Sequence, residues 1–93
     1  MYVGILEVNV KIIDAFNLKD KRQVLRSVFD RVRRKLDFSP GEVGDEDMIN
    51  LSTWGFSCVS NSYSHVVKRL NTLVNFLEDD YRFEILEVRR EII

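Results

Sequence analysis

A chain of 93 residues with 45% hydrophobic and 31% charged side chains is long enough for one small domain, and its composition is close to that of average globular proteins. This composition argues against the disordered and collagen-like classes. No apolar run approaches the roughly 20 residues that cross a bilayer, which argues against a membrane span. The N-terminus lacks the basic start and apolar block of a secretory signal, and a single cysteine, Cys58, cannot form an internal disulfide. We therefore expect one domain over residues 1–93 in a reducing compartment, the cytoplasm.

The first half of the chain changes from strand to helix periodicity. Apolar and polar residues alternate over residues 2–12, which predicts a long first strand. Asn17 is placed to cap the helix that follows, in which apolar residues recur at spacings of three, four and seven as far as Leu36. Residues 37–43 contain Pro40, which cannot donate to a strand ladder, so we expect an edge strand there and an acidic loop over residues 44–50.

The second half repeats this order of elements. Residues 51–60 alternate again, and the parity of Trp54, Phe56 and Cys58 predicts that this face lies under the helices. A second amphipathic helix is expected after the capping residues at 60–62, ending near residues 78–80, and a fourth strand over residues 82–92. The order predicts an α+β, ferredoxin-like βαββαβ sandwich, a four-stranded antiparallel sheet with two helices on one face. Right-handed crossovers place the first and third strands at the centre and the others at the edges.

Positive charge is concentrated in the first helix. Eight of the 14 basic residues lie between Lys19 and Lys35 with only two acids, a local charge of +6, which leaves −7 for the rest of a chain whose net charge is −1. Segregated charge of this kind indicates a polyanionic partner. We therefore predict contact with a polyanion such as RNA through a candidate set of basic residues: Lys19, Arg22, Arg26, Arg33 and Arg34.

An ordinary solvated helix face is the competing interpretation of this charge. A pI of about 5.8 is unlike that of a dedicated nucleic-acid binder. Part of the charge is also expected to be neutralised internally, with Lys21, Arg31 and Lys35 pairing with acids at 45–47 or 78–80. The glycine-aromatic signature of base-stacking ribonucleoprotein domains is absent, so any RNA would be recognised by shape and charge.

The sheet face that lacks helices is expected to carry a second candidate surface. Its predicted apolar residues are Val3, Ile5, Phe83 and Ile85, beside polar neighbours such as Glu7 and Arg89. An apolar patch on an open sheet of a small domain is most often covered by self-association. The alternative function is therefore a homodimeric protein-interaction or structural module that acts through this open face.

Four segments carry a resemblance to a known family: VGILEV at 3–8, LKDKR at 18–22, VSN at 59–61 and LEVRREI at 86–92. With these at matching separations, the chain resembles the bacterial YlxP proteins over nearly its whole length. The resemblance implies a ferredoxin-like domain of unknown function, encoded in some bacteria among transcription and ribosome-maturation factors, and it implies no reaction. Together with the basic helix, this gene setting makes RNA or a ribosomal assembly the expected partner. Ser39-Pro40-Gly41 departs from the family's ordinary second strand.

No set of residues indicates catalysis or a metal site. His65 is the only histidine, and a general base or phosphate ligand at that position is weighed against a surface residue of the second helix. One cysteine and one histidine do not make a zinc site, and the acids at 45–47 lack the spacing of a calcium loop. We therefore predict a non-enzymatic protein with no metal and no cofactor.

Overall fold

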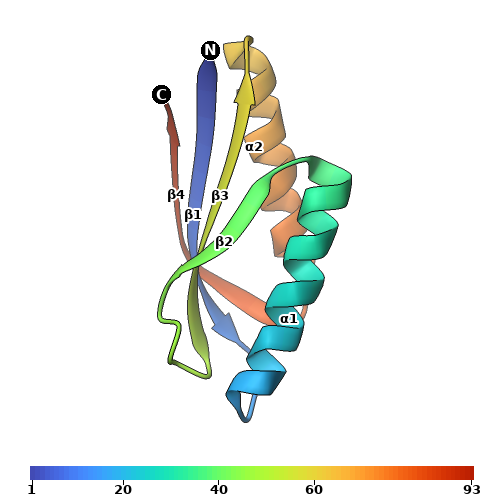
Figure 1. The fold of residues 1–93 in the computed structure, drawn as a ribbon, viewed down its shortest axis with the longest axis vertical. Helices are drawn as coiled ribbons and strands as arrows, with labels where there is room; N and C mark the ends of the chain where they lie inside the picture. Colours follow the sequence, from blue (N-terminus) through green and yellow to red (C-terminus); the bar gives the residue numbers. More distant parts are fainter.

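The structure, a computed structural model, describes all 93 residues. A four-stranded sheet forms one layer, and both helices lie on one side of it (Figure 1). No helix combines the length and the apolar content that a membrane crossing requires. The elements in chain order are β1 Tyr2–Ile12, α1 Leu18–Arg31, the π-helical turn η1 Val32–Leu36, β2 Ser39–Gly44, β3 Leu51–Ser60, α2 Tyr63–Glu78 and β4 Phe83–Ile92.

The strand order is β2-β3-β1-β4, and every neighbouring pair is antiparallel. The predicted ferredoxin-like topology is therefore confirmed, with β1 and β3 at the centre. Pro40 pairs with Phe56 from the edge strand β2, as expected for a residue without an N–H donor. The second strand begins later than predicted, because Asp37 takes a left-handed conformation with φ of 57° at the end of η1.

Side-chain caps fix where both helices begin. The side chain of Asn17 accepts a hydrogen bond from the backbone N–H of Asp20 at 2.8 Å, and the Asp20 carboxylate accepts one from the N–H of Phe16 at 3.0 Å. These bonds satisfy donors that the first turn of α1 leaves unpaired. Ser62 accepts a bond from the N–H of His65 at 3.3 Å and caps α2 in the same way. The cap predicted at Asn17 is confirmed.

The core lies between the helices and one face of the sheet. It is a single cluster of 18 buried hydrophobic residues. Trp54 lies at its centre and packs edge to face on Phe29, Phe56 and Phe83, with ring centroids 4.8 to 6.5 Å from that of Trp54. The predicted placement of Trp54, Phe56 and Cys58 under the helices is confirmed, since all three are buried.

One glycine allows α2 to approach the sheet closely. A β-carbon at Gly4 would lie 2.6 Å from Cγ1 of Val66 and 3.1 Å from Sγ of Cys58. No real side chain is compatible with the first distance without movement of α2. Gly4 is therefore required for close packing between β1 and the N-terminal half of this helix.

A bulge in β4 changes which of its side chains face the helices. In β1, the neighbouring residues Val10 and Asn9 pair with Ile85 and Glu87 of β4. Leu86, between the two partners, is therefore an extra residue. Because side-chain direction alternates at period two, one extra residue reverses the parity of the strand. Phe83, which is buried, and Ile85, which packs on the core, therefore lie on the helix side. The prediction that both belong to the open face was wrong.

Candidate nucleic-acid interface

Seven of the eight basic residues of α1 and η1 are exposed. All five candidate polyanion contacts, Lys19, Arg22, Arg26, Arg33 and Arg34, are among them. Of these five, only Arg34 forms an ion pair, in which its Nη2 lies 2.8 Å from Oδ2 of Asp30 one turn earlier. An exposed pair of this kind contributes about 0.3–0.5 kcal/mol to stability, so it competes weakly with a phosphate for the guanidinium.

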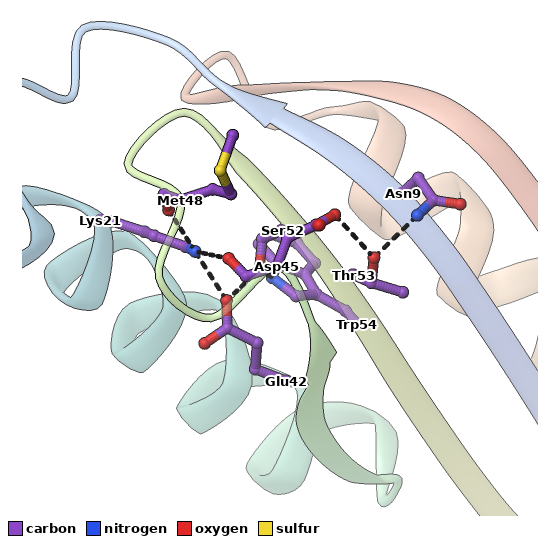
Figure 2. Close-up of polar contacts among 8 residues, drawn as sticks. All are labelled: Asn9, Lys21, Glu42, Asp45, Met48, Ser52, Thr53 and Trp54. Carbon is purple, nitrogen blue, oxygen red and sulfur yellow. Dashed lines mark hydrogen bonds and ion pairs between the residues drawn. The ribbon is translucent and has the colours of Figure 1, made fainter.

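Lys21 is the exception on this helix, because its side chain is buried. Its Nζ donates hydrogen bonds to the carbonyl oxygens of Asp45 at 2.7 Å and Met48 at 2.6 Å, and it lies 2.9 Å from Oε2 of Glu42 (Figure 2). The three N–H donors of the ammonium thus have three acceptors. Lys21 therefore links the acidic loop to α1, and because all three of its donors are used it cannot contact a ligand.

The contacts of Lys21 continue through β3 (Figure 2). Glu42 also accepts a hydrogen bond from Oγ of Ser52 at 2.5 Å, and Ser52 accepts one from Nε1 of Trp54 at 2.7 Å. Every buried side-chain nitrogen and oxygen in the protein has a hydrogen-bond partner. Because its buried polar atoms are all paired, this network stabilises the fold.

A second group of basic residues surrounds a hollow between η1 and α2. The hollow is lined by Lys35, Leu36, His65, Lys68, Arg69 and Thr72, none of which is acidic. The sequence alone did not predict that these residues lie together. The signal in the sequence was the spacing of His65, Lys68 and Arg69, which places three basic-type side chains within one turn of α2.

Arg69 is held rigidly beside this hollow. Its Nη2 donates to the carbonyl oxygens of Asp37 at 2.5 Å and Leu36 at 3.4 Å, and its Nη1 donates to that of Val59 at 3.3 Å. The guanidinium carbon also lies 5.2 Å from the ring centroid of Phe38, within the range of a cation–π contact. Because the last carbonyls of a helix lack intrahelical partners, Arg69 caps η1 and ties it to α2 and β3.

Acidic residues follow the C-terminal end of α2, where arginines lie beside them. Nη2 of Arg82 lies 2.6 Å from Oδ2 of Asp80, and this hydrogen-bonded pair lowers the pKa of the Asp80 carboxyl and raises the pKa of the Arg82 guanidinium. Arg31 lies over the ring of Phe76, 5.2 Å from its centroid, and its charge also lowers the pKa of Asp80. The positive charge of Arg31 is thus partly compensated by Asp80 of the same chain.

The predicted internal pairing is correct in part. Lys21 contacts the acidic loop, although through backbone oxygens and through Glu42 of β2. Arg31 influences Asp80 without a direct ion pair, and Lys35 has no ion pair at all. The exposed basic residues of α1 and η1 that form no ion pair are therefore Lys19, Arg22, Arg26, Arg31, Arg33 and Lys35.

The open face of the sheet carries an apolar row at one end. Val59 of β3 pairs with Val3 of β1, and Ile93 exchanges two backbone hydrogen bonds with Val3 from the opposite side, so three apolar residues cross three strands. Val59 and Ile93 are 59% and 62% exposed. Ile5 follows Val3 on the same face. Val59 and Ile93 take the place that sequence analysis gave to Phe83 and Ile85.

Farther along, the open face is polar and has no aromatic platform. Arg89 pairs with Glu7 across the two strands and with Glu87 at 2.7 Å. Both Trp54 and Phe56 point into the core instead. Base stacking on the sheet, as in ribonucleoprotein domains, is not available to this protein.

His65 is exposed at the start of α2. Its side chain has no hydrogen-bond or ion-pair partner within the protein. General-base catalysis requires a nucleophile or an orienting group beside the imidazole. The geometry therefore agrees with the interpretation of His65 as a surface residue that faces the basic hollow.

Residues 3–90 match the family described as "Protein of unknown function (DUF503)". The chain belongs to this family. It is also 32% identical over 89 residues to the uncharacterized protein YlxP of Bacillus subtilis (strain 168), and the match covers 96% of this chain and 97% of that protein. A dimeric ferredoxin-like protein from an uncultured marine organism covers the whole chain and 96% of its own with a TM-score of 0.52 at 10% identity, which supports the fold alone.

The structure shows what the charged residues of the segment LKDKR do in this DUF503 protein. Asp20 caps α1, Lys21 fastens the loop, and Arg22 is exposed with no partner. Two of the charged residues in the segment thus stabilise the fold, and Lys19 and Arg22 are free to contact a ligand.

Proposed function

We propose that this protein binds RNA, alone or within a ribosomal assembly, through the exposed basic surface of α1 and η1 in the cytoplasm, and that it is not an enzyme. The supporting observation is the exposure of seven basic side chains along one helix, of which only Arg34 has an ion-pair partner. Lysine and arginine bind polyanions largely through the counterions that the phosphates release. The contacts proposed are those of Lys19, Arg22, Arg26, Arg33 and Arg34.

Recognition in this proposal depends on the position of phosphates. The helix presents guanidinium and ammonium groups on one rigid rod, and the open face of the sheet carries no aromatic ring for stacking. Phosphate contacts set orientation and affinity and carry no direct sequence information. We therefore expect tight binding to depend on RNA shape, and sequence preference to be weak.

The test is a titration of labelled RNA at low and at physiological salt. The variant R22Q/R26Q/R33Q/R34Q should lower the slope of log Kd against log salt by about 2.8, because each phosphate contact on a single strand contributes about 0.7. A charge-matched comparison uses R26Q/R33Q beside K11Q/R90Q, which removes two positive charges elsewhere. Unchanged affinity in the four-arginine variant, or no binding by the native protein at low salt, would overturn the proposal.

A second candidate function is a homodimer that covers the open sheet face. The observation that favours it is the apolar row of Val59, Val3 and Ile93. A second copy is the occupant with matching chemistry, since the apolar row can meet itself across a two-fold axis. This surface is separate from α1, so a dimer would leave the basic helix of each copy accessible.

Analytical ultracentrifugation over a range of concentrations tests the dimer. Val59→Lys places a charge in the apolar row of the proposed interface at a position already 59% exposed, so the fold should be retained. We expect a dimer for the native protein and a monomer for Val59→Lys, with Lys11→Gln as the control that stays dimeric. A native monomer at millimolar concentration would exclude this function.

A further inference from the structure

We infer that the hollow between η1 and α2 binds a phosphate group, so that the polyanion crosses from α1 to α2 at this end of the helix layer. The inference rests on the proposed RNA binding and adds a specific site to it. The hollow is lined by Lys35, His65, Lys68 and Arg69 with Leu36 and Thr72. Sequence analysis placed none of these in the candidate interface.

The charge of the lining distinguishes this hollow from its neighbours. The concavity on the outer side of α1 includes Asp30 beside Arg26 and Arg33, and the one at the opposite end of the layer includes Asp79 and Asp80. An anion in either of those would lie close to a carboxylate. Between η1 and α2, three permanent cations and a histidine line the space without an acid, which favours an anionic ligand.

Arg69 supplies a cation that is already in position. Three carbonyl oxygens and the ring of Phe38 hold its guanidinium, so little side-chain freedom remains to be lost on binding. The three hydrogen bonds use three of its five N–H groups and leave two for a ligand. The Asp37 carboxylate lies 3.9 Å from Nη2 but is fully exposed and lies outside this lining. Lys35 and Lys68 are exposed and can close on a phosphate from two elements.

A phosphate between the two elements also sets the course of the ligand. RNA bound only to α1 would follow that helix, whereas a phosphate shared by Lys35 and Lys68 directs the strand across the junction. The acids at the C-terminal end of α2 disfavour the opposite crossing, near Asp79 and Asp80. The segregation of charge within the helix layer thus predicts that the RNA crosses from α1 to α2 at the junction of η1 with α2.

The first experiment compares K35Q/K68Q with K11Q/R90Q in the RNA titration, using the full-length protein. We expect K35Q/K68Q to lower the salt slope by about 1.4, as two lost single-strand contacts require, and K11Q/R90Q to stay within about twofold of the native affinity. If R26Q/R33Q weakens RNA binding while K35Q/K68Q behaves as K11Q/R90Q does, the inferred site is wrong and the proposed function stands.

The second experiment does not depend on RNA. Inorganic phosphate is titrated into ¹⁵N-labelled protein, and amide and side-chain NMR shifts are followed at constant ionic strength. Saturable changes confined to Lys35 and to residues 65–72, and absent in K35Q/K68Q, support the site even if RNA binding fails. Shifts that are absent, or spread evenly over all exposed basic residues, would overturn it.

Discussion

Lys21 and Arg22 are neighbours in the chain and differ completely in their surroundings. Lys21 is 1% exposed and has three acceptors, whereas Arg22 is exposed and has none. Successive helix residues point about 100° apart, so one side chain reaches the loop after β2 and the next reaches solvent. The charge of a segment therefore mixes cations that stabilise the fold with cations that are free to bind. Here Lys21 stabilises the fold, whereas Lys35 and Lys68 beside the hollow are exposed and form no ion pair.

The largest expected effect is that of Lys21→Met. The substitution keeps the apolar stem but leaves the Glu42 carboxylate and two carbonyl oxygens without their partner. We expect the free energy of unfolding to fall by about 3 kcal/mol in urea denaturation, since removal of one partner of a buried pair costs about 3–5 kcal/mol and Glu42 is partly exposed. Arg22→Met is the matched control and should change it by less than about 0.5 kcal/mol. Equal effects of the two substitutions would contradict the distinction between these residues.

Arg69→Met should have the next largest effect. Three hydrogen bonds to carbonyl oxygens are lost, while packing against Phe38 is largely kept by the methionine. Because water reaches the exposed Asp37, we expect a loss of about 1–2 kcal/mol in the free energy of unfolding. Hydrogen exchange should show faster opening of the end of α1 and of η1. Lys68→Met, one residue earlier on α2, serves as control, and a comparable loss there would argue against a capping role for Arg69.

Asp80→Asn tests how much the partly exposed ion pair of Asp80 with Arg82 contributes to stability, for comparison with the buried pair at Lys21. The folded protein lowers the pKa of Asp80, so its ionised form stabilises the fold at neutral pH. This contribution is lost as the pH falls from the ordinary aspartate pKa near about 4 through the lower pKa of the folded state. We expect the variant to be less stable than the native protein by at most about 1 kcal/mol at pH 7, with the difference closing in acid. Urea denaturation of both proteins over a pH series measures this difference. A difference that does not change with pH would exclude the ionic contribution.

The smallest effect on stability is expected for R26Q/R33Q. Both side chains are exposed and neither forms an ion pair, so the free energy of unfolding should change by less than about 0.5 kcal/mol. Thermal and urea unfolding measure this directly. A clear loss of stability would mean that these arginines, like Lys21, stabilise the fold. Weaker RNA binding by the variant would then no longer be evidence of lost phosphate contacts.

Much of the fold follows from local patterns in the sequence. The six main elements, the cap at Asn17 and the edge position of Pro40 were all predictable, because each depends on periodicity or on one residue's own backbone chemistry. The π-helical end of the first helix was not, since its apolar residues continue the α-helical spacing as far as Leu36. The candidate site was predictable only as a region of charge.

The amino-acid sequence by itself determined the order of elements, the helix-covered face of β3 and the concentration of positive charge before Leu36, since these depend on residues near one another in the chain. Tertiary structure alone decided which residues the two surfaces contain. One extra residue at Leu86 turned Phe83 and Ile85 inward, and packing of α2 against η1 brought Lys68 and Arg69 beside Lys35. Both outcomes depend on pairings between residues distant in sequence, which local periodicity does not encode.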